Sequence, residues 1–118
     1  FGDQAVHELY HKLLKRLDDS SDQVRIAICK TLEVFLVAAN KKCYSGTTID
    51  YTLDQLFIHL DDPDPNMQQA VLKVLIVAGS IDKNLVIKKA EVNRDSHRTP
   101  ELCNKVIFEV QGYEILED

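Results

Sequence analysis

The chain has 118 residues, of which 45% are hydrophobic and 28% are charged, and its net charge is −5. This composition excludes a disordered chain and is typical of one globular domain with a continuous core. The acidic balance argues against nucleic acid or an anionic membrane as a partner. No apolar run approaches the roughly 18 residues that a membrane-spanning helix needs.

Cysteine usage and the first residue indicate the setting of the chain. Cys29, Cys43 and Cys103 are an odd number without C-x-x-C spacing, so neither a disulfide scaffold nor a structural zinc site is expected. A reducing, cytoplasmic location fits this pattern. Cys29 falls within an apolar helical pattern and is expected to be a small buried hydrophobe. Because the chain opens at Phe1 and not at Met, we expect it to be a fragment of a longer protein.

Apolar residues at helical spacing predict a first pair of helices. The first stripe consists of Val6, Leu9, Tyr10, Leu13, Leu14 and Leu17. After a polar turn, a second stripe consists of Val24, Ala27, Ile28, Thr31, Leu32 and Phe35. Each is one apolar face of a 3.6-residue helix, so each helix needs a partner to cover it.

A second pair of helices follows a loop over residues 40–47. Its stripes are Ile49, Leu53, Leu56, Phe57 and Leu60, then Met67, Ala70, Val71, Val74, Leu75 and Ala78. Between them, Asp64 is placed to cap the next helix, and Pro65, which lacks an N–H, suits the first helical position. The sequence therefore predicts a second helical hairpin.

The two hairpins are copies of one pattern. Residues 13–36 align without gaps on residues 56–79, and 8 of the 24 pairs are identical. The turn of the first reads "LDDSSDQVRIAICKTL" and that of the second "LDDPDPNMQQAVLKVL". A helical hairpin repeated at a period of about 40 residues is typical of a solenoid, in which each copy buries the apolar face of its neighbour.

A third, weaker unit follows. It has a helix with a mixed face, then a helix opened by Pro100, and Gly112 suits the end of that last helix. A weak stripe is typical of a terminal capping repeat. We therefore divide the single domain, residues 1–118, into repeat one (1–40), repeat two (48–80), a degenerate capping repeat (81–112) and a tail (113–118). Strand-like alternation is absent from the sequence, which predicts an all-α fold.

The turn and the helix after it resemble the HEAT-repeat family. In "LDDSSDQVRIAI" the turn Asp of that family corresponds to Asp19, its Val-Arg pair to Val24 and Arg25, and its small residue to Ala27. The resemblance implies a right-handed α-solenoid of about three antiparallel helix pairs. It also implies a ladder of Asp and Arg side chains between repeats. The second unit has Gln68 where Arg is expected, so the ladder must end or change there.

Two further stretches, "YTLDQLFIHLDDPD" (51–64) and "HRTPELC" (97–103), resemble the C-terminal region of the HEAT-repeat axonemal dynein assembly factors. This resemblance implies a non-enzymatic, cytoplasmic scaffold that helps to preassemble dynein arms for motile cilia. It implies no cofactor. The implied partners are other proteins, among them axonemal dynein subunits and assembly chaperones, and neither nucleic acid nor membrane. The alternative is a generic HEAT-repeat segment of a transport or regulatory complex that serves as a solenoid end cap.

Two motifs have a possible catalytic or metal-binding meaning. "HELYH" (7–11) has the H-E-x-x-H spacing of zinc proteases, which puts two histidines one turn apart. The third ligand is missing, because Leu14 and Leu17 occupy the positions of the extended motif, so no zinc chemistry is expected. The acidic pairs Asp18-Asp19 and Asp61-Asp62 lack the glycine and closing glutamate of a calcium loop. Since they recur at one repeat position, turn and cap chemistry explains them better.

A candidate partner surface lies on the second helix of each pair. In the HEAT family these helices line the concave face, and their non-core positions here form two lines: Ile26, Lys30, Glu33 and Val37, then Gln69, Lys73 and Ile76. Apolar residues in such lines are either scattered surface residues, or cover from a loop, or the anchors of a partner groove. The sequence leaves these alternatives open.

Overall fold

The structure, a computed structural model, describes the backbone of residues 3–38 and 46–117. It also describes their side chains, except at residues 3, 4, 6, 7, 38, 46–48 and 113–117. The elements are α1 (Asp3–Lys15), the 3₁₀ helix η1 (Arg16–Asp18), α2 (Asp22–Ala38), α3 (Gly46–Leu60), α4 (Pro65–Ala78), α5 (Lys83–Arg94) and α6 (Pro100–Glu117). No strand occurs in these ranges, which confirms the all-α prediction.

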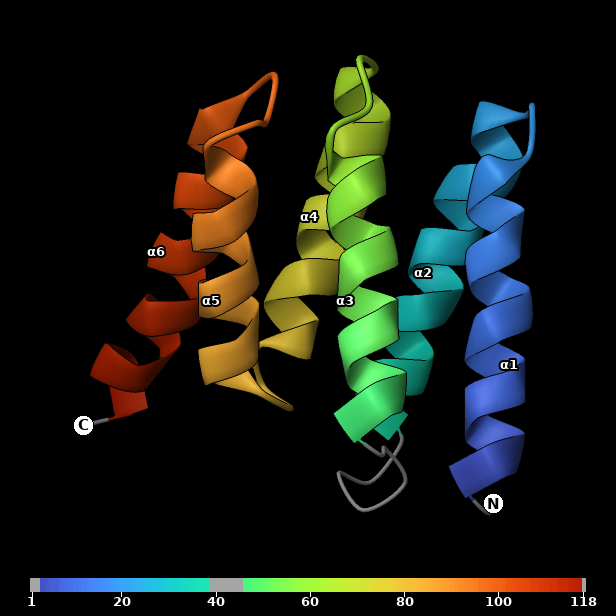
Figure 1. The fold of residues 1–118 in the computed structure, drawn as a ribbon, viewed down its shortest axis with the longest axis horizontal. Coiled ribbons are helices and arrows are strands. Elements are labelled where there is room, and N and C mark those ends of the chain that lie inside the picture. The colour runs from blue at the N-terminus through green and yellow to red at the C-terminus, as the bar shows by residue number, and fades with distance from the viewer. Residues whose placement is uncertain (1–2, 39–45, 118) are drawn as a thin grey trace.

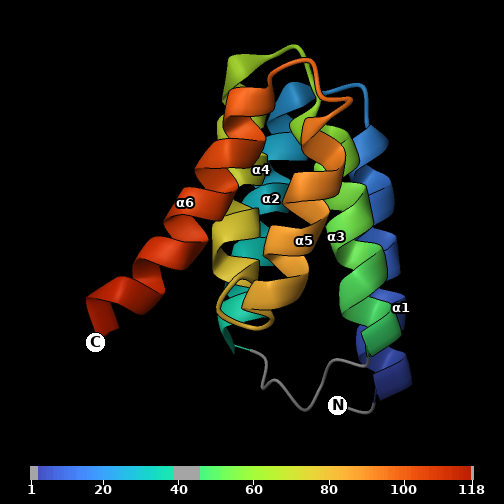
Figure 2. The same cartoon turned by 60° about the vertical axis from the view of Figure 1, so that its left-hand side comes forward.

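The six α-helices form three antiparallel hairpins stacked side by side (Figure 1). The first helices of the hairpins, α1, α3 and α5, lie in one layer, and the second helices, α2, α4 and α6, lie in the other (Figure 2). The turns within the hairpins share one edge of the molecule, and the two ends of the chain lie at opposite sides of the stack (Figure 1). This arrangement is the helical-hairpin solenoid that the repeated sequence predicts.

The same local chemistry begins the second helix of the first two hairpins. The Oδ1 atom of Asp19 accepts a hydrogen bond from the Ser21 backbone N–H at 2.8 Å. The Oδ1 atom of Asp62 accepts one from the Asp64 N–H at the same distance. Asp64 in turn caps α4, with its carboxylate 3.0 Å from the Asn66 nitrogen and Pro65 at the first helical position. Both the cap and the turn role of these aspartates were expected from the sequence.

One continuous core lies between the two layers. It draws on every α-helix, and its fully buried members include Leu17, Cys29, Leu32, Leu56, Leu75, Val86 and Val106. The apolar stripe of each helix is thus covered by its hairpin partner and by the adjacent hairpin. Burying a leucine or a valine in this way stabilises the fold by about 1.5–3 kcal/mol each.

Two predicted helix boundaries are wrong. The last helix does not end at Gly112, because α6 continues to Glu117. None of the described glycines has a positive φ, so Gly112 does not form the left-handed cap that ends many helices. The residues after it include Glu and Leu, which favour helix. The loop predicted over residues 40–47 is also too long, since α3 starts at Gly46.

Candidate interaction surface

The predicted partner residues all lie on α2 and α4, in the layer of second helices. Lys30, Gln69 and Lys73 are exposed. Val37, near the end of α2, is 74% exposed and is the most exposed apolar side chain of the set. Glu33 is half-buried. We call the exposed faces of α2, α4 and α6 the second-helix surface.

Ile26 and Ile76 are less accessible to solvent than the exposed residues of the two predicted lines. Both are half-buried and pack against the core cluster. Ile26 lies on the same face of α2 as the fully buried Cys29, because the two are three residues apart. These two isoleucines are therefore only partly accessible to a partner. Their role in partner binding stays a prediction.

The sequence reasoning missed Phe108 on α6. Its side chain is 73% exposed, as exposed as Val37. The hairpin-opening prolines, Pro65 and Pro100, set a register in which Phe108 stands where the second repeat has Lys73. That register could have placed Phe108 on the second-helix surface. Exposed aromatic residues beside charges are common anchors of protein interfaces.

An ion pair joins the first hairpin to the second at the turn edge. The Nη1 atom of Arg25 lies 2.7 Å from Oδ2 of Asp62, and the two side chains are only 14% and 15% exposed. The Nη2 atom of Arg25 also bonds Asp22 in its own hairpin. At the position equivalent to Arg25, Gln68 instead donates to the Asp62 carbonyl oxygen at 2.7 Å. The ladder thus changes at Gln68, as the sequence predicts.

The first aspartate of each acidic pair also reaches the next unit. Oδ1 of Asp18 lies 3.3 Å from Nε2 of His59, which is buried on α3. Oδ1 of Asp61 accepts a hydrogen bond from the Arg98 backbone N–H at 2.9 Å. Burial lowers the pKa of His59, although the charge of Asp18 opposes that shift. The acidic pairs therefore connect hairpins as well as forming turns.

A second polar bridge joins α3 to α5 away from the turns. The Nζ atom of Lys89 lies 2.9 Å from Asp50 and 2.6 Å from Asp54, one helical turn apart on α3. Burial by itself lowers the pKa of Lys89, but hydrogen bonds to the two carboxylates outweigh burial and raise it above its ordinary value. These ion pairs hold the layer of first helices in register.

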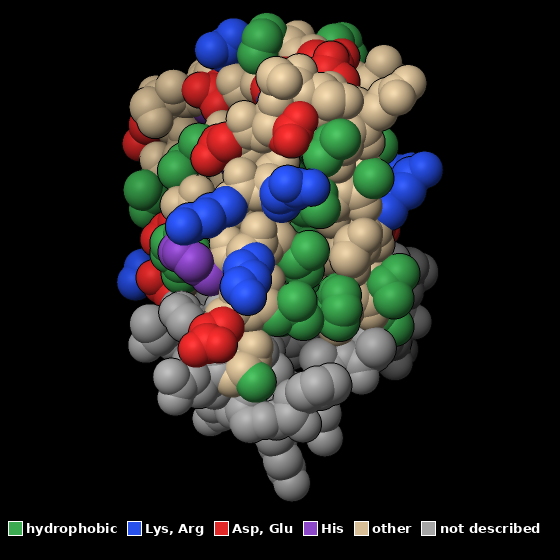
Figure 3. All heavy atoms as spheres, turned by 90° about the vertical axis from the view of Figure 1, so that its right-hand side faces the viewer, with side chains coloured by type: hydrophobic (Ala, Val, Ile, Leu, Met, Phe, Trp, Pro, Cys, Tyr) green, Lys and Arg blue, Asp and Glu red, His purple; other side chains and the backbone are tan. Residues whose placement is uncertain are grey.

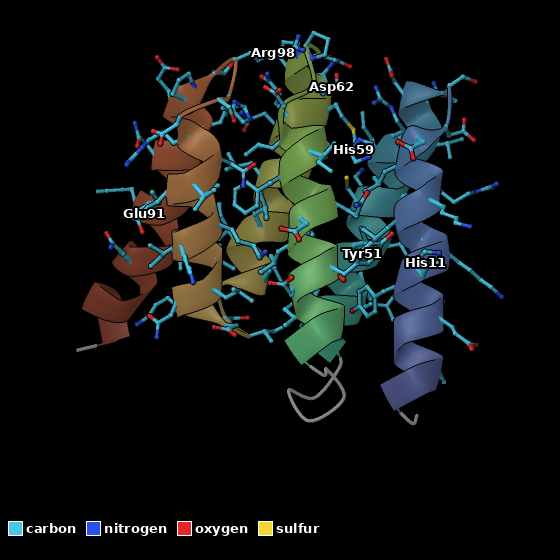
Figure 4. The ribbon with its side chains drawn as sticks, in the orientation of Figure 1. His11, Tyr51, His59, Asp62, Glu91 and Arg98 are labelled. Carbon is cyan, nitrogen blue, oxygen red and sulfur yellow. The ribbon has the colours of Figure 1, made fainter. Side chains whose placement is uncertain are left out.

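The "HELYH" motif does not gather a metal site in the described part of the chain. The His11 ring stacks at 5.6 Å on Tyr51 of α3 (Figure 4), and Glu8 is exposed. The side chain of His7 lies outside the described residues. Among the described side chains, no three His, Cys, Asp or Glu residues are grouped to hold a metal ion. The expected lack of zinc chemistry stays a prediction.

The described cysteines are buried. Cys29 and Cys103 are both 0% exposed, which confirms the reading of Cys29 as a small hydrophobe. Burial raises the pKa of each thiol to about 11, so neither is a ready nucleophile at neutral pH. Cys43 lies outside the described residues. Of the helices that the structure describes, none has the length and apolar character needed to cross a bilayer.

Stacked helical hairpins joined by polar bridges define a repeat protein of the solenoid class. No protein-family model matches the sequence. No solved structure matches it either. The class therefore rests on the internal repeat and on the arrangement of the helices.

Three curated proteins that share one name are similar in sequence to this chain. The chain is 35% identical over 112 residues to "Dynein axonemal assembly factor 5" of Xenopus laevis, which covers 92% of this chain and 13% of that protein. It is 36% identical over 112 residues to the protein of the same name from Homo sapiens, with the same coverage. The mouse protein of that name is 30% identical over 108 residues. The chain spans about an eighth of the length of these relatives.

Proposed function

We propose that this chain is part of a non-enzymatic scaffold that acts in the cytoplasm during assembly of axonemal dynein arms. The observation that carries the proposal is the likeness to proteins named as dynein axonemal assembly factors, which extends over about nine-tenths of the chain. The fold supports a binding role, because stacked hairpins expose long helix faces to partners.

The second-helix surface is the proposed contact for protein partners. Val37 and Phe108 offer exposed apolar side chains on the first and last of its helices. Lys30, Lys73 and Lys105 are exposed on the same three helices. Apolar side chains flanked by charges suit a protein partner, since the apolar groups supply affinity and the charges select orientation. Axonemal dynein subunits and their assembly chaperones are the proposed partners.

Replacement of Val37 and Phe108 by Asp in the natural full-length protein tests this proposal. The double variant should still fold, because exposed substitutions change stability by less than about 0.5 kcal/mol. It should co-precipitate at least about tenfold less axonemal dynein heavy chain from ciliated cells, if these side chains are interface anchors. In depleted cells it should fail to restore dynein arms, scored by electron microscopy of axonemes.

Val92→Asp is the matched control. Val92 is an exposed valine, at 67%, on α5 in the opposite layer, so its replacement places an aspartate outside the second-helix surface, with one added negative charge against two in the double variant. This control should bind and rescue normally. A folded double variant that binds heavy chains as well as the control does would exclude the second-helix surface as the contact. If the unmodified protein neither binds dynein subunits nor supports arm assembly, the end-cap alternative gains support.

A further inference from the structure

Each of the three helices of the second-helix surface carries an exposed lysine. The residues are Lys30 on α2, Lys73 on α4 and Lys105 on α6, and we call them the lysine row. Lys30 and Lys73 occupy one position of the repeat, since residues 13–36 align on residues 56–79. Adjacent packed helices have axes about 8–10 Å apart. The row therefore crosses the stack in steps of about that length, with one lysine for each hairpin.

An exposed aromatic side chain lies at the α6 end of the row. Phe108 is 73% exposed, and it is three residues from Lys105, so the two side chains share one face of α6. In the register set by Pro65 and Pro100, Phe108 stands at the repeat position of Lys73. The position that carries a cation in the first two hairpins thus carries an aromatic ring in the third. The row and its end together offer three cations and one apolar contact.

The described carboxylates do not neutralise the lysine row. None of the ion pairs among the described residues includes one of its three lysines. Lys89 on α5, by contrast, is held by Asp50 and Asp54. The helix α4 has no acidic residue along its length, and Glu33 on α2 and Glu109 on α6 are half-buried. The three ammonium groups are therefore available to the carboxylates of a partner.

Exposed acidic side chains gather elsewhere, at the turn edge. The side chains of Asp18, Asp22 and Asp61 are 77%, 58% and 38% exposed. Glu101 at the start of α6 belongs to the same edge and is exposed. Figure 3 views the first hairpin from its outer side, with acidic side chains toward the turn edge at the top and basic side chains projecting at the right, over the second helices. The lysine row is thus a positive strip on a chain whose net charge is −5.

We propose that the lysine row binds an acidic segment of a partner protein, which crosses the stack in an extended conformation. Its carboxylates pair with the three lysines, and an apolar side chain contacts Phe108. A chain in the polyproline II conformation rises about 3.1 Å per residue and turns once in three residues, so every third side chain lies on one side, about 9 Å from the last. That spacing matches the distance between adjacent helices. This inference rests on the proposed function in one respect, that the second-helix surface is the protein contact.

Opposite charge together with an apolar anchor favours a protein segment over a nucleic acid. Charges across an interface select the partner and its orientation, and an exposed aromatic ring supplies affinity. A nucleic acid has a phosphate at every nucleotide, so it requires a continuous basic surface. The lysine row has a single cation for each hairpin, and the acidic turn edge beside it would repel the flanking phosphates. An acidic protein segment can place its carboxylates only where the lysines are.

A fluorescein-labelled peptide is the probe, and fluorescence anisotropy measures its binding to the natural full-length protein. The peptide has a glutamate at every third position, three in all, and a leucine after the last glutamate. The row variant combines Lys30→Gln, Lys73→Gln and Lys105→Gln. We expect it to bind the peptide at least about tenfold more weakly, because it loses three charge pairs. Circular dichroism checks that the row variant keeps the helical fold.

The control variant replaces three exposed lysines of the first helices, so its net charge changes by the same amount: Lys12→Gln, Lys15→Gln and Lys88→Gln. It should bind the peptide within about twofold of the natural protein, because charges farther away than a Debye length of about 8 Å are screened at physiological salt. Phe108→Ala should weaken binding several-fold, since it removes the apolar contact. A peptide of the same composition with its glutamates side by side should also bind more weakly.

Equal binding of the peptide by the row variant and the control variant would overturn the inference, and so would a lack of binding by the natural protein. A labelled oligouridine that binds more tightly than the peptide, and loses that binding in the row variant, would assign the row to a nucleic acid and overturn the proposal. Equal binding of the two peptides would overturn the extended spacing. The peptide assay contains no dynein, so row-dependent binding by a protein that fails to support arm assembly would overturn the proposed function alone.

Discussion

Arg25 of the first hairpin and Asp62 of the second form a nearly buried ion pair at 2.7 Å, although 37 residues separate them in the chain. Asp62 is fixed from its own side by the Asp64 N–H, so the pair ties one turn rigidly to the neighbouring helix. The equivalent step between the second and third hairpins uses a different contact, from the Arg98 backbone to Asp61. The junctions of this solenoid are therefore not chemically identical.

Replacing Arg25 by Gln should destabilise the chain by about 1–3 kcal/mol at neutral pH, because the carboxylate of Asp62 would remain buried with its strongest partner gone. Urea denaturation monitored by circular dichroism measures the loss. Arg98→Gln is the control, since that side chain is 54% exposed and its contact to Asp61 uses the backbone as well. It should cost less than about 0.5 kcal/mol. Equal effects of the two substitutions would contradict the special role of Arg25.

His59 should make the fold less stable in mild acid. Burial lowers its pKa in the folded state below the ordinary value of 6.5, so the unfolded chain binds the proton more readily. The part of the free energy of unfolding that depends on neutral His59 is fully present above about pH 6.5. It is lost as the pH falls through the lowered pKa of the folded state. Thermal unfolding between pH 7.5 and 5 should therefore show a slope that His59→Asn reduces.

Replacing Asp18 by Asn tests in which direction the charge of Asp18 moves the pKa of His59. The charge of Asp18 raises the pKa of His59, so its removal should lower that pKa further and steepen the loss of stability in acid. Proton NMR of the His59 ring follows the same shift directly. A pKa of His59 that rises in the Asp18→Asn variant would contradict the pairing across the hairpin junction.

Two glycines should respond to alanine with opposite signs. At Gly79 a Cβ atom would lie 2.7 and 2.9 Å from the two γ-carbons of Val110, so the Val110 side chain or α6 itself would have to shift. We expect Gly79→Ala to cost about 1–3 kcal/mol. At Gly112 nothing lies within 4 Å, and Gly112→Ala should stabilise α6 by about 0.5–1 kcal/mol through helix propensity.

The contact of Gly79 with Val110 is checked by a double-mutant cycle. Val110→Ala removes the two γ-carbons, so Gly79→Ala should cost much less in that background than in the natural chain. Thermal unfolding of the four proteins gives the coupling. An additive result would mean that the cost at Gly79 has another source.

Zinc should have no specific effect on this chain. The described residues offer no group of three ligands, and leucines occupy the further positions of the extended motif. Elemental analysis of tag-free protein should find less than one zinc per chain, and added chelator should leave the unfolding temperature unchanged. Stoichiometric zinc that is lost in both His7→Ala and His11→Ala would refute this expectation.

Helix starts and the buried face of each helix could be predicted from the sequence. Asp64 and Pro65 predict the start of α4, because an N-cap side chain and the fixed φ of proline act on residues only a few positions away. The apolar stripes and the aligned hairpins identified the core positions of Cys29 and Leu75, since helical periodicity alone selects the buried face. The predicted helix end at Gly112 was wrong because a glycine is compatible with a helix end but does not require one.

The repeated pattern by itself determined that this protein is a stack of helical hairpins, because each apolar stripe must be covered by a neighbour. Only the tertiary structure decided which polar groups meet across the junctions. Arg25 reaches Asp62, and Asp18 reaches His59, through the spacing of whole helices, which no local pattern encodes. It also separated Val37, which is exposed, from Ile26 and Ile76, which are half-buried at the edge of the core. Helical spacing gives the direction of a side chain, but its burial depends on how closely the adjacent helix approaches, and packing between hairpins sets that distance.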